Sequence, residues 1–463
     1  MTQLTCTVHG VRKSLPLRKA VFDFGANPVW MLHGPLGPRD LSDRARDLID
    51  LAGAIYRIES QIRRRPTDPA VRWELVVPVR DPEFWTVTGG PLLASCLGFL
   101  NRARWILTFT TRPNAVDFIR PEADERSIDQ VTLFSGGMDS LSGAGSHNGL
   151  RDTIQLVSFY HSQAKLQSEL AAALGYRPPT QWRLSGRRGR EGMNLIRSFM
   201  FLCLGAAVAE SYGVRRIVQY ENGVLGTAVP QSGNFIPTRH AHPETHRRVV
   251  KLFDAVFGGS FLVTNPFLPL TKREVGEALV AAIGKERAEE LFRRTETCWY
   301  LFQPRVGGLE KANGQPCGVC TPCIVRRTAR PAESAAGAWP GWLGYAFNLT
   351  DPQYGEHPVV GTTFRAYLEL IDITLTAPSD TALIDDLAPE ARALIDEVHG
   401  PDEALVAGVL RRFASEFCDT FGILRPEAAA IKPSGPKRNE RSRSSTQHPA
   451  TLVRTHPPGT QDD

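Results

Sequence analysis

Strand-like and helix-like stretches alternate between residues 128 and 283, and this alternation restricts the fold more than any other feature of the sequence. The apolar runs QVTLF, TIQLVSF, RRIVQY and SFLVT alternate with helical patterns such as QAKLQSELAAAL, NLIRSFMFLCLGAAVAESYG and TKREVGEALVAAI. Strands that alternate with helices form a parallel sheet that is covered on both faces. Ligands of such sheets bind beyond the carboxyl ends of the strands. We therefore predict an α/β fold whose functional site lies at that edge.

The regions outside this pattern predict further domains. A chain of 463 residues is too long for one ordinary core, so two or three domains are expected. The helical pattern at 41–64 and the strand-like RWELVVPVR and RWILTFTT indicate an N-terminal α+β accessory domain over 1–125. The parallel-sheet domain then spans 126–330. Stretches such as ARALIDEVHG and DEALVAGVLRRFASEF indicate a helical C-terminal region over 331–428. Residues 429–463 are rich in Pro, Ser and Arg and are expected to be a disordered basic tail.

Charge and hydropathy exclude several classes of protein. The net charge is +5, but six basic and three acidic residues after Ile431 account for +3 of it. The remaining +2 argues against an extended nucleic-acid-binding face, so a nucleic-acid partner is not indicated. No apolar run approaches the roughly 18 residues of a membrane span. The N-terminus lacks the apolar core of a signal peptide, so we expect a cytoplasmic protein without membrane association.

The stretch SGGMDS, residues 135–140, stands where a strand ends and a helix begins. Two adjacent glycines allow the backbone to turn tightly and to approach a ligand closely. Backbone N–H groups at the start of the helix then form an anion cradle, to which the two serine hydroxyls contribute. The stretch matches neither the Walker A pattern nor the dinucleotide fingerprint. We expect a phosphate or pyrophosphate to bind to this loop and its neighbours, namely Leu133, Phe134, Ser135, Gly136, Gly137, Met138, Asp139, Ser140 and Leu141.

Four of the eight cysteines lie close together in the sequence. Cys298 precedes two overlapping Cys-x-x-Cys units that are formed by Cys317, Cys320 and Cys323. Four thiolates suit tetrahedral Zn²⁺, and a closed site of this kind has a structural role. An iron–sulfur cluster remains the alternative, because thiolates bind both metals. The spacing does not decide between them.

SGGMDS matches the PP-loop motif S-G-G-x-D-S of ATP pyrophosphatases. Together with the cysteine knuckle, it makes residues 128–330 resemble the QueC family, the 7-cyano-7-deazaguanine synthases. FYHSQAKLQSEL and NPFLPLTKREVGEAL are similar to further segments of that family. The resemblance implies an adenine nucleotide α-hydrolase-like fold with ATP, Mg²⁺ and Zn²⁺ as cofactors. It also implies adenylation of a 7-deazaguanine carboxylate with release of pyrophosphate.

The positions of several polar residues, together with this resemblance, predict their roles. Asp139, Ser140 and Lys272 are expected to be catalytic, with Asp139 organising Mg²⁺. Glu221 and Asn222 follow a strand and are expected to bind substrate, although a capped turn would explain them equally well. His242, with His240 nearby, is expected to contact substrate or act as a base. A surface loop is the alternative for both histidines.

The chain also departs from the housekeeping members of the family, which have about half its length. YENGVLGTAVPQ, TRHAHPETHRR, LIDLAGAIYRIESQ and LGFLNRARWILTF resemble the QueC-like proteins of bacterial anti-phage operons, notably QatC of the Qat system. This resemblance implies a protein partner that is encoded in the same operon. Three functions stay open: a housekeeping ligase in queuosine precursor biosynthesis, transfer of the activated deazaguanine to a macromolecule, and non-enzymatic sensing of ATP. A tRNA-thiolating PP-loop enzyme is a further alternative.

Overall fold

The computed structural model describes most of the chain up to residue 423. The described residues are 3–9, 19–23, 29–61, 71–112, 115–147, 149–160, 163–185, 195–228, 238–329, 344–388 and 403–423. All of them belong to one compact unit, Met1–Leu424. The basic tail predicted at 429–463 and the helical stretch ARALIDEVHG lie outside the described residues.

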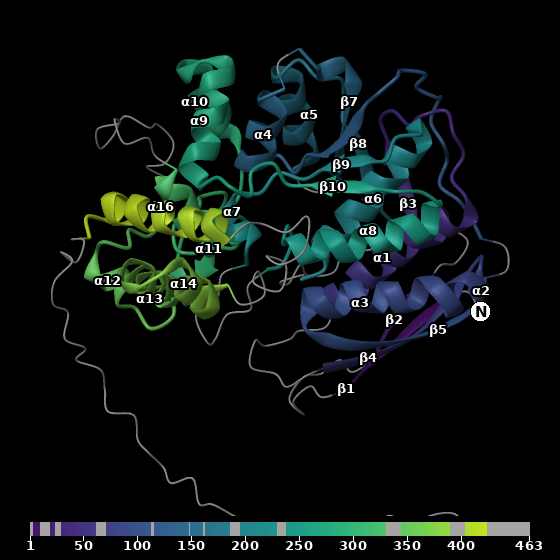
Figure 1. The fold of residues 1–463 in the computed structure, drawn as a ribbon, viewed down its shortest axis with the longest axis horizontal. Helices are drawn as coiled ribbons and strands as arrows, with labels where there is room; N and C mark the ends of the chain where they lie inside the picture. Colours follow the sequence, from purple (N-terminus) through teal and green to yellow (C-terminus); the bar gives the residue numbers. More distant parts are fainter. Residues whose placement is uncertain are drawn as a thin grey trace, which may run out of the picture. The chain divides into compact units, whose positions relative to one another are not determined.

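A six-stranded sheet forms the centre of this unit (Figure 1). Five neighbouring strands are parallel, and one edge strand from the N-terminal region, β3, runs antiparallel to β8. The middle strands are buried on both faces, as the near-continuous apolar runs predict. The strands are, in spatial order, β10 (Leu262–Thr264), β9 (Arg216–Val218), β6 (Gln130–Leu133), β7 (Ile154–Phe159), β8 (Thr180–Leu184) and β3 (Trp30–His33).

The strand order reverses direction between β6 and β9. From β6 the chain adds β7 and β8 on one side, and it then returns to add β9 and β10 on the other side. In open α/β sheets, ligands bind at such a reversal, just beyond the carboxyl ends of the two strands. SGGMDS follows β6, and Glu221 and Asn222 lie shortly after β9. The predicted parallel α/β arrangement is therefore confirmed.

Helices cover both faces of the central sheet (Figure 1). Every residue but three of α6 is buried, because this helix lies between the sheet and the helices α1 and α8. That position explains why its sequence is apolar on all sides. On the first face lie α4 (Met138–Gly145), α5 (Ala164–Ala173), α9 (Lys272–Ile283), α10 (Lys285–Arg294) and the 3₁₀ turn η2 (Arg151–Thr153); on the second lie α1 (Asp43–Gln61), α6 (Arg197–Tyr212) and α8 (Pro243–Phe257).

The N-terminal region builds a second sheet of four strands, in the order β2-β1-β4-β5. Only the β4–β5 pair is parallel. Its buried side chains and those of α1, α3 and α6 belong to one continuous apolar core. The boundary predicted at residue 125 stays a prediction, and the elements on either side of it share that core. The elements are β1 (Gln3–His9), β2 (Lys19–Asp23), β4 (Val71–Val79), α2 (Pro82–Phe84), the π-helical turn η1 (Trp85–Gly89), α3 (Gly90–Asn101) and β5 (Ala103–Thr111).

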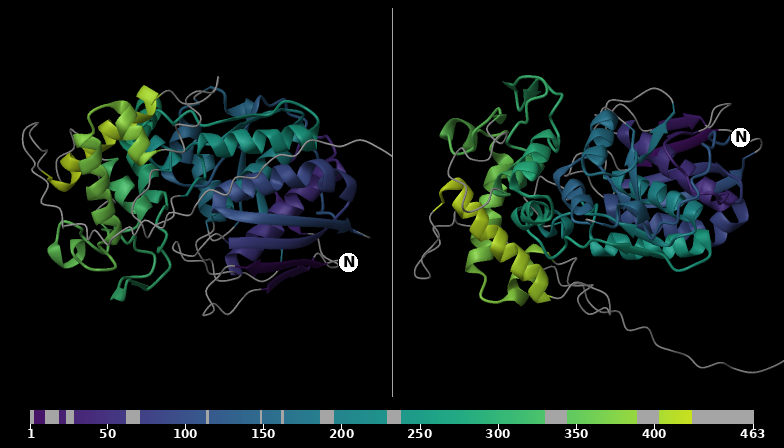
Figure 2. Two further views of the ribbon diagram at one scale, coloured as in Figure 1. Left: turned by 60° about the horizontal axis from the view of Figure 1, so that its bottom comes forward. Right: turned by 90° about the horizontal axis from the view of Figure 1, so that it is seen from above.

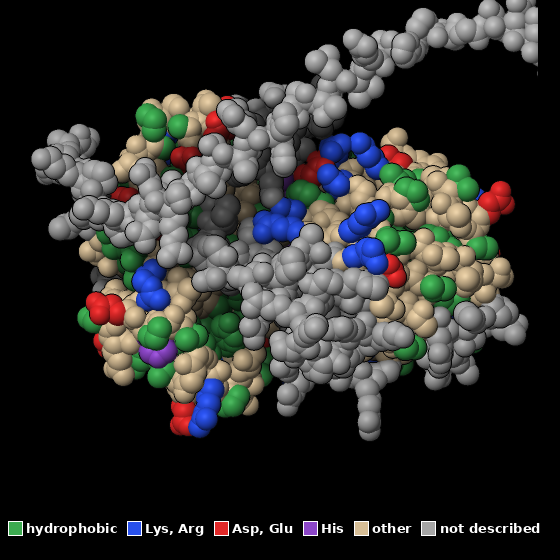
Figure 3. Space-filling view, turned by 90° about the horizontal axis from the view of Figure 1, so that it is seen from below, with side chains coloured by type: hydrophobic (Ala, Val, Ile, Leu, Met, Phe, Trp, Pro, Cys, Tyr) green, Lys and Arg blue, Asp and Glu red, His purple; other side chains and the backbone are tan. Residues whose placement is uncertain are grey.

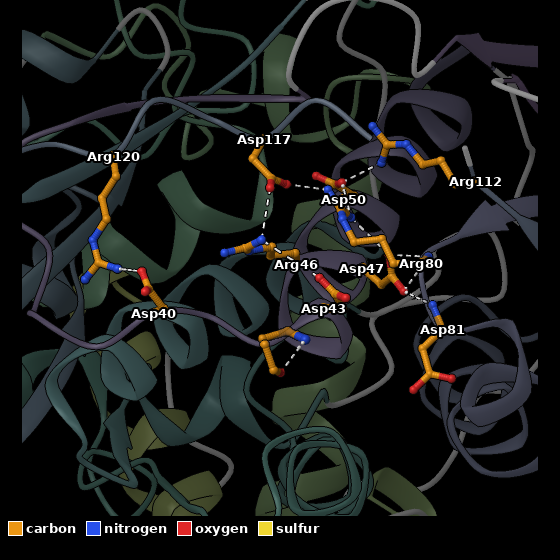
Figure 4. A network of polar contacts seen from close by, with 12 residues as sticks. Asp40, Asp43, Arg46, Asp47, Asp50, Arg80, Asp81, Arg112, Asp117 and Arg120 are labelled. Carbon is orange, nitrogen blue, oxygen red and sulfur yellow. Dashed lines mark hydrogen bonds and ion pairs between the residues drawn. The ribbon is translucent and has the colours of Figure 1, made fainter. Parts of the chain in front are cut away.

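A buried ionic network fastens α1 to the end of β4 (Figure 4). The Arg80 guanidinium lies 3.0 Å from both Asp47 Oδ1 and Asp50 Oδ2, and Arg112 lies 2.7 Å from Asp50 Oδ2. Asp47 also accepts hydrogen bonds from the backbone N–H of Arg80 and from the Trp85 indole. Each buried charge thus has an opposite charge, which a buried ion requires. Nothing in the sequence pattern predicted this network.

The C-terminal region is helical in the residues that the structure describes, as predicted (Figure 2). Its helices pack around an aromatic core that includes Tyr367, Phe413 and Phe417. A short hairpin with two glycines of positive φ at its turn, Gly307 and Gly308, precedes the helices. The elements that precede residue 331 are β11 (Arg305–Val306), β12 (Leu309–Glu310) and α11 (Thr321–Thr328). The helices after it are α12 (Pro352–Gly355), α13 (Thr362–Thr376), α14 (Asp380–Leu387) and α16 (Glu403–Phe421).

The surface carries charges of both signs. In Figure 3, Lys and Arg side chains gather in several groups, and Asp or Glu side chains lie beside most of them. Among the described residues, no helix has both the length and the apolar character that a membrane span requires.

Candidate functional site

The SGGMDS loop folds tightly between β6 and α4. Gly136 has a φ of +81°, a conformation that favours glycine, and Gly137 begins the helix as its N-cap. Ser135 Oγ accepts a hydrogen bond from Gly137 N at 3.2 Å, and Ser140 Oγ donates to Gly137 O at 3.1 Å. Gln167 holds the loop from α5 by donating to Ser135 O at 3.1 Å. No side chain among the described residues caps α4, so its first N–H groups suit an anionic ligand.

Small residues let α4 pack closely against its neighbours. A Cβ at Gly143 would come within 2.2 Å of the Tyr220 ring, and a Cβ at Gly145 within 2.1 Å of Leu279 Cδ1. Tyr220 lies just beyond β9 and Leu279 lies on α9. The glycines that follow SGGMDS therefore bring the loop close to β9 and to α9. The small residues of LSGAG indicate close packing, but the sequence does not show that Tyr220 and Leu279 are the residues they pack against, because both are distant along the chain.

Four polar side chains meet where the strand order reverses. Lys272 Nζ lies 2.7 Å from Asp139 Oδ1, and Asn222 Nδ2 donates to Asp139 Oδ2 at 3.0 Å. Asn222 Nδ2 also lies 3.0 Å from Glu221 Oε1. Asp139 comes from the loop after β6, Glu221 and Asn222 come from the segment after β9, and Lys272 begins α9 after β10. The structure thus brings together these four predicted residues, which we call the Asp139 cluster.

Burial and charge set the protonation of the two carboxyl groups in this cluster. Burial favours the neutral form of Asp139, but the Lys272 ammonium and hydrogen bonds from Glu221 and Asn222 outweigh it and hold its pKa below the ordinary value. Burial and the neighbouring Asp139 carboxylate raise the pKa of Glu221 well above its ordinary value. The Asp139–Lys272 ion pair therefore lies beside Glu221, whose neutral form is favoured by burial and by the Asp139 carboxylate.

His242 makes its described contacts with Glu244 and Phe99. It is the N-cap of α8, where Nδ1 accepts a hydrogen bond from Glu244 N at 3.1 Å. Its ring lies against Phe99, with ring centroids 5.3 Å apart. Burial and the nearby Arg239 lower the pKa of His242 to about 3, so the ring is neutral. His240 O accepts from Gln219 Nε2 at 3.3 Å. The roles predicted for these histidines stay predictions, and the contacts of His242 are those of a helix cap.

The four clustered cysteines form a compact group of thiols. Their sulfur atoms all lie within 4.8 Å of one another, and those of Cys317 and Cys323 are 3.9 Å apart. Bonds of the usual Zn–S length place sulfurs about 3.8 Å apart in a tetrahedral site. Cys298 Sγ accepts hydrogen bonds from the backbone N–H groups of Tyr300 and Cys317, both at 3.3 Å. The four residues can therefore hold one metal ion, and zinc is compatible with this donor set.

A glycine is required inside this cysteine knuckle. Gly318 has a φ of +83°, and a Cβ there would lie 2.5 Å from the Arg327 guanidinium and 2.7 Å from Phe347 O. The other thiols, as hydrogen-bond donors, hold the pKa of Cys298 well below its ordinary value. All eight cysteines of the chain are free in the structure.

The segment that leads into the knuckle borders the SGGMDS loop. A Cβ at Gly137 would lie 3.5 Å from Thr297 Cγ2. Arg326, on the helix α11 that Cys320 caps and that contains Cys323, donates to Thr295 O at 2.7 Å and to Thr297 Oγ1 at 3.3 Å. Gln163 Nε2 donates to Glu296 Oε2 at 2.8 Å. The cysteine knuckle thus holds in place the segment that borders the SGGMDS loop on one side. The contact between Gln163 and Glu296 was not predicted from the sequence.

The chain matches no protein-family model, and no significantly similar curated protein was found. Fold and site together define an α/β protein with a parallel central sheet. It has a buried polar cluster at the reversal of strand order and a four-cysteine group that can hold a metal ion.

Proposed function

We propose that the chain is a QueC-like ATP pyrophosphatase, which cleaves ATP to AMP and pyrophosphate while it adenylates a 7-deazaguanine carboxylate. The observation that carries this proposal is the contact between Lys272 and Asp139 at the reversal of strand order. It joins the PP-loop-like stretch to a cation at the edge where α/β sheets bind ligands. The assignment of a 7-deazaguanine carboxylate as the substrate rests on the resemblance of the sequence motifs.

The residues of the loop suit the triphosphate. The uncapped start of α4, with the hydroxyls of Ser135 and Ser140, would cradle phosphate oxygens. Lys272 would balance the charge that develops on the departing pyrophosphate. Because Lys272 is almost fully buried, its charge acts in surroundings of low dielectric constant.

The chemistry balances without a redox partner. A carboxylate oxygen of the substrate attacks the α-phosphorus of ATP, the bond to the α,β-bridging oxygen breaks, and pyrophosphate leaves. An amine or ammonia then attacks the acyl carbon and displaces AMP, losing a proton as the C–N bond forms. Asp139, the ion-paired carboxyl group of the cluster, can accept such a proton.

The two proposed metals have different roles. Mg²⁺, when bound, would neutralise phosphate charge, and Asp139 would hold it directly or through water. Asp139 Oδ1 accepts a hydrogen bond from Lys272, whereas Oδ2 accepts two from Asn222, so Oδ1 has the larger remaining acceptor capacity for this purpose. Zn²⁺ would be held by Cys298, Cys317, Cys320 and Cys323. Four thiolates leave no open position, so this ion would, through Arg326 and Thr297, support the segment that borders the SGGMDS loop.

The activity is tested by supplying the purified chain with ATP, Mg²⁺ and 7-carboxy-7-deazaguanine. We expect AMP and pyrophosphate in equal amounts, and formation of ADP and phosphate alone would contradict the proposal. With ammonium as the acceptor the product is a free amide, and a nitrile forms only if a second ATP adenylates the amide oxygen, which then leaves with AMP. If the chain serves an anti-phage system with an operon-encoded protein partner, mass spectrometry will show a deazaguanine-sized adduct on that partner instead.

A further inference from the structure

Helix α16 contacts the residue that caps the helix of Lys272. Glu416 Oε1 accepts a hydrogen bond from Thr271 Oγ1 at 2.7 Å, and both side chains are buried. Thr271 is the N-cap of α9 and directly precedes Lys272. Glu416 and Thr271 are 145 residues apart in the sequence. The C-terminal region therefore reaches to within one residue of the Asp139 cluster.

A second side chain of α16 contacts the N-terminal cap of α9. Thr271 and Glu274 form a capping box, in which Glu274 N donates to Thr271 Oγ1 at 3.3 Å and Thr271 N donates to Glu274 Oε2 at 2.7 Å. Arg412 pairs with the other oxygen, Glu274 Oε1, at 2.8 Å. It also donates to Pro269 O at 2.7 Å. Both halves of the capping box are thus held by side chains of α16.

The same helix lies behind the segment of Asn222. Residues Gly223–Gly226 form the short helix α7, which packs against α16 (Figure 1). A Cβ at Gly223 would lie 3.0 Å from Val409 Cγ1 and 2.1 Å from Leu268 O. Val224 shares an apolar core with Val409. One rigid helix therefore supports both Asn222 and Lys272, the two residues that hold Asp139.

We propose that Glu416 and Arg412 are positioning residues, which fix the capping box of α9 and thereby hold Lys272 Nζ on Asp139. Glu416 contacts Thr271 and Arg412 contacts Glu274, so their effect on the Asp139 cluster passes through these two residues. A displacement of about 1 Å at a catalytic group can lower turnover by two orders of magnitude. The kinetic part of this inference rests on the proposed ATP cleavage, whereas the position of Lys272 can be measured without it.

Two pairs of variants separate positioning from folding. Arg412→Met removes the surface contact to Glu274, and Arg411→Met is its matched control, because Arg411 pairs with Asp380 on α14 at 3.0 Å instead. Glu416→Leu removes the acceptor for Thr271, whereas Glu416→Gln keeps an acceptor oxygen and is the rescue variant. Arg412 is about half exposed, so its variant tests the proposal even if Glu416→Leu does not fold.

Two readouts are measured on each full-length variant. The first is kcat and KM for ATP in AMP formation, where we expect Arg412→Met and Glu416→Leu to lose about 10- to 100-fold in kcat with KM little changed. The second is the rate at which an amine-reactive reagent labels Lys272, measured by mass spectrometry against the exposed Lys165. We expect severalfold faster labelling of Lys272 in the two variants and wild-type rates in Arg411→Met and Glu416→Gln.

The outcomes distinguish the two proposals. A wild-type chain that forms no AMP refutes the proposed function, and the labelling of Lys272 still tests the positioning. Equal losses in Arg412→Met and Arg411→Met would overturn the inference, since they would show general loosening of α16. Wild-type labelling and kcat in folded Arg412→Met would overturn it as well.

Discussion

Lys272 Nζ lies 2.7 Å from Asp139 Oδ1, although the two residues are 133 positions apart in the sequence. Both side chains are buried, so each charge depends on the other. Breaking a buried pair by removing one partner costs about 3–5 kcal/mol, because the remaining charge is left uncompensated. The pair is therefore expected to matter for stability as well as for turnover.

The first prediction concerns this pair. Asp139→Asn and Lys272→Met should each lower the thermal midpoint and abolish AMP formation, and the double variant should regain stability but not activity. Calorimetry and an AMP assay on the three variants check this. A double variant that is as unstable as the sum of the single ones would show that the ion pair contributes little to the fold.

The second prediction concerns the close approach of α4 to β9. Gly143→Ala should destabilise the chain by about 1–3 kcal/mol, because the new methyl group overlaps the Tyr220 ring. Gly408→Ala on α16 is the control, since a Cβ there meets only the flexible Arg412 guanidinium at 3.2 Å. Because this flexible side chain can move aside, the change should be neutral or stabilising by up to about 1 kcal/mol. Equal urea midpoints for the two variants would contradict the packing argument.

The third prediction concerns the cysteine knuckle. Purified protein should contain about one zinc per chain, and Cys320→Ser should lose the metal and much of the stability, because binding of a structural metal is coupled to folding. Elemental analysis and thermal melting with and without a chelator measure this. Iron and acid-labile sulfide in place of zinc would establish the alternative cluster. Gly318→Ala should weaken metal retention, because its Cβ would collide with Phe347 O.

The fourth prediction concerns pH. Burial raises the pKa of Glu416 to about 7, against weaker opposing effects of Thr271 and Arg273, and Glu274 and Glu277 raise it further. A carboxyl group with a raised pKa stabilises the folded state most below its unfolded pKa of roughly 4.5, and this contribution is lost as the pH rises through about 7. Glu416→Gln should remove this dependence.

Urea unfolding of wild type and Glu416→Gln between pH 4.5 and 8 tests the sign of this pH dependence of stability. The difference in unfolding free energy should grow in favour of the Gln variant as the pH rises. Arg412, which lies one turn away, is present in both proteins and cancels in this comparison. Parallel curves would place the pKa of Glu416 near its ordinary value.

The sequence predicted the parts of the fold that have strong local patterns. The apolar runs at β6, β7, β9 and β10 and the helices between them appear where the alternation placed them. Asp139, Glu221, Asn222 and Lys272 also meet, because each follows a strand of one parallel sheet and such strands share a carboxyl edge. The spacing of the four clustered cysteines was enough to predict that they lie together.

Long-range partners could not be predicted in the same way. The strand β8 has only five residues, in which Gln181 and Arg183 alternate with Thr180, Trp182 and Leu184, so it lacks the continuous apolar run that marked the other strands. The Asp47–Arg80 network joins residues that are 33 positions apart and has no periodic signature. His242 and Glu416 are single polar residues, and only the packed structure shows that one caps a helix and the other contacts a cap.

The pairing of β3 with β8 sets a constraint on how the chain acquires its fold. Trp30 lies opposite Leu184, so the edge of the central sheet cannot close until a segment far along the chain has been synthesised. Contacts of such sequence separation slow folding, because a long loop must be closed before they form. During translation the Trp30 side chain, which is fully buried in the folded chain, stays unpaired with β8 until that strand has been synthesised. The strand β3 is therefore expected to be among the last strands of the central sheet to gain protection from proteases.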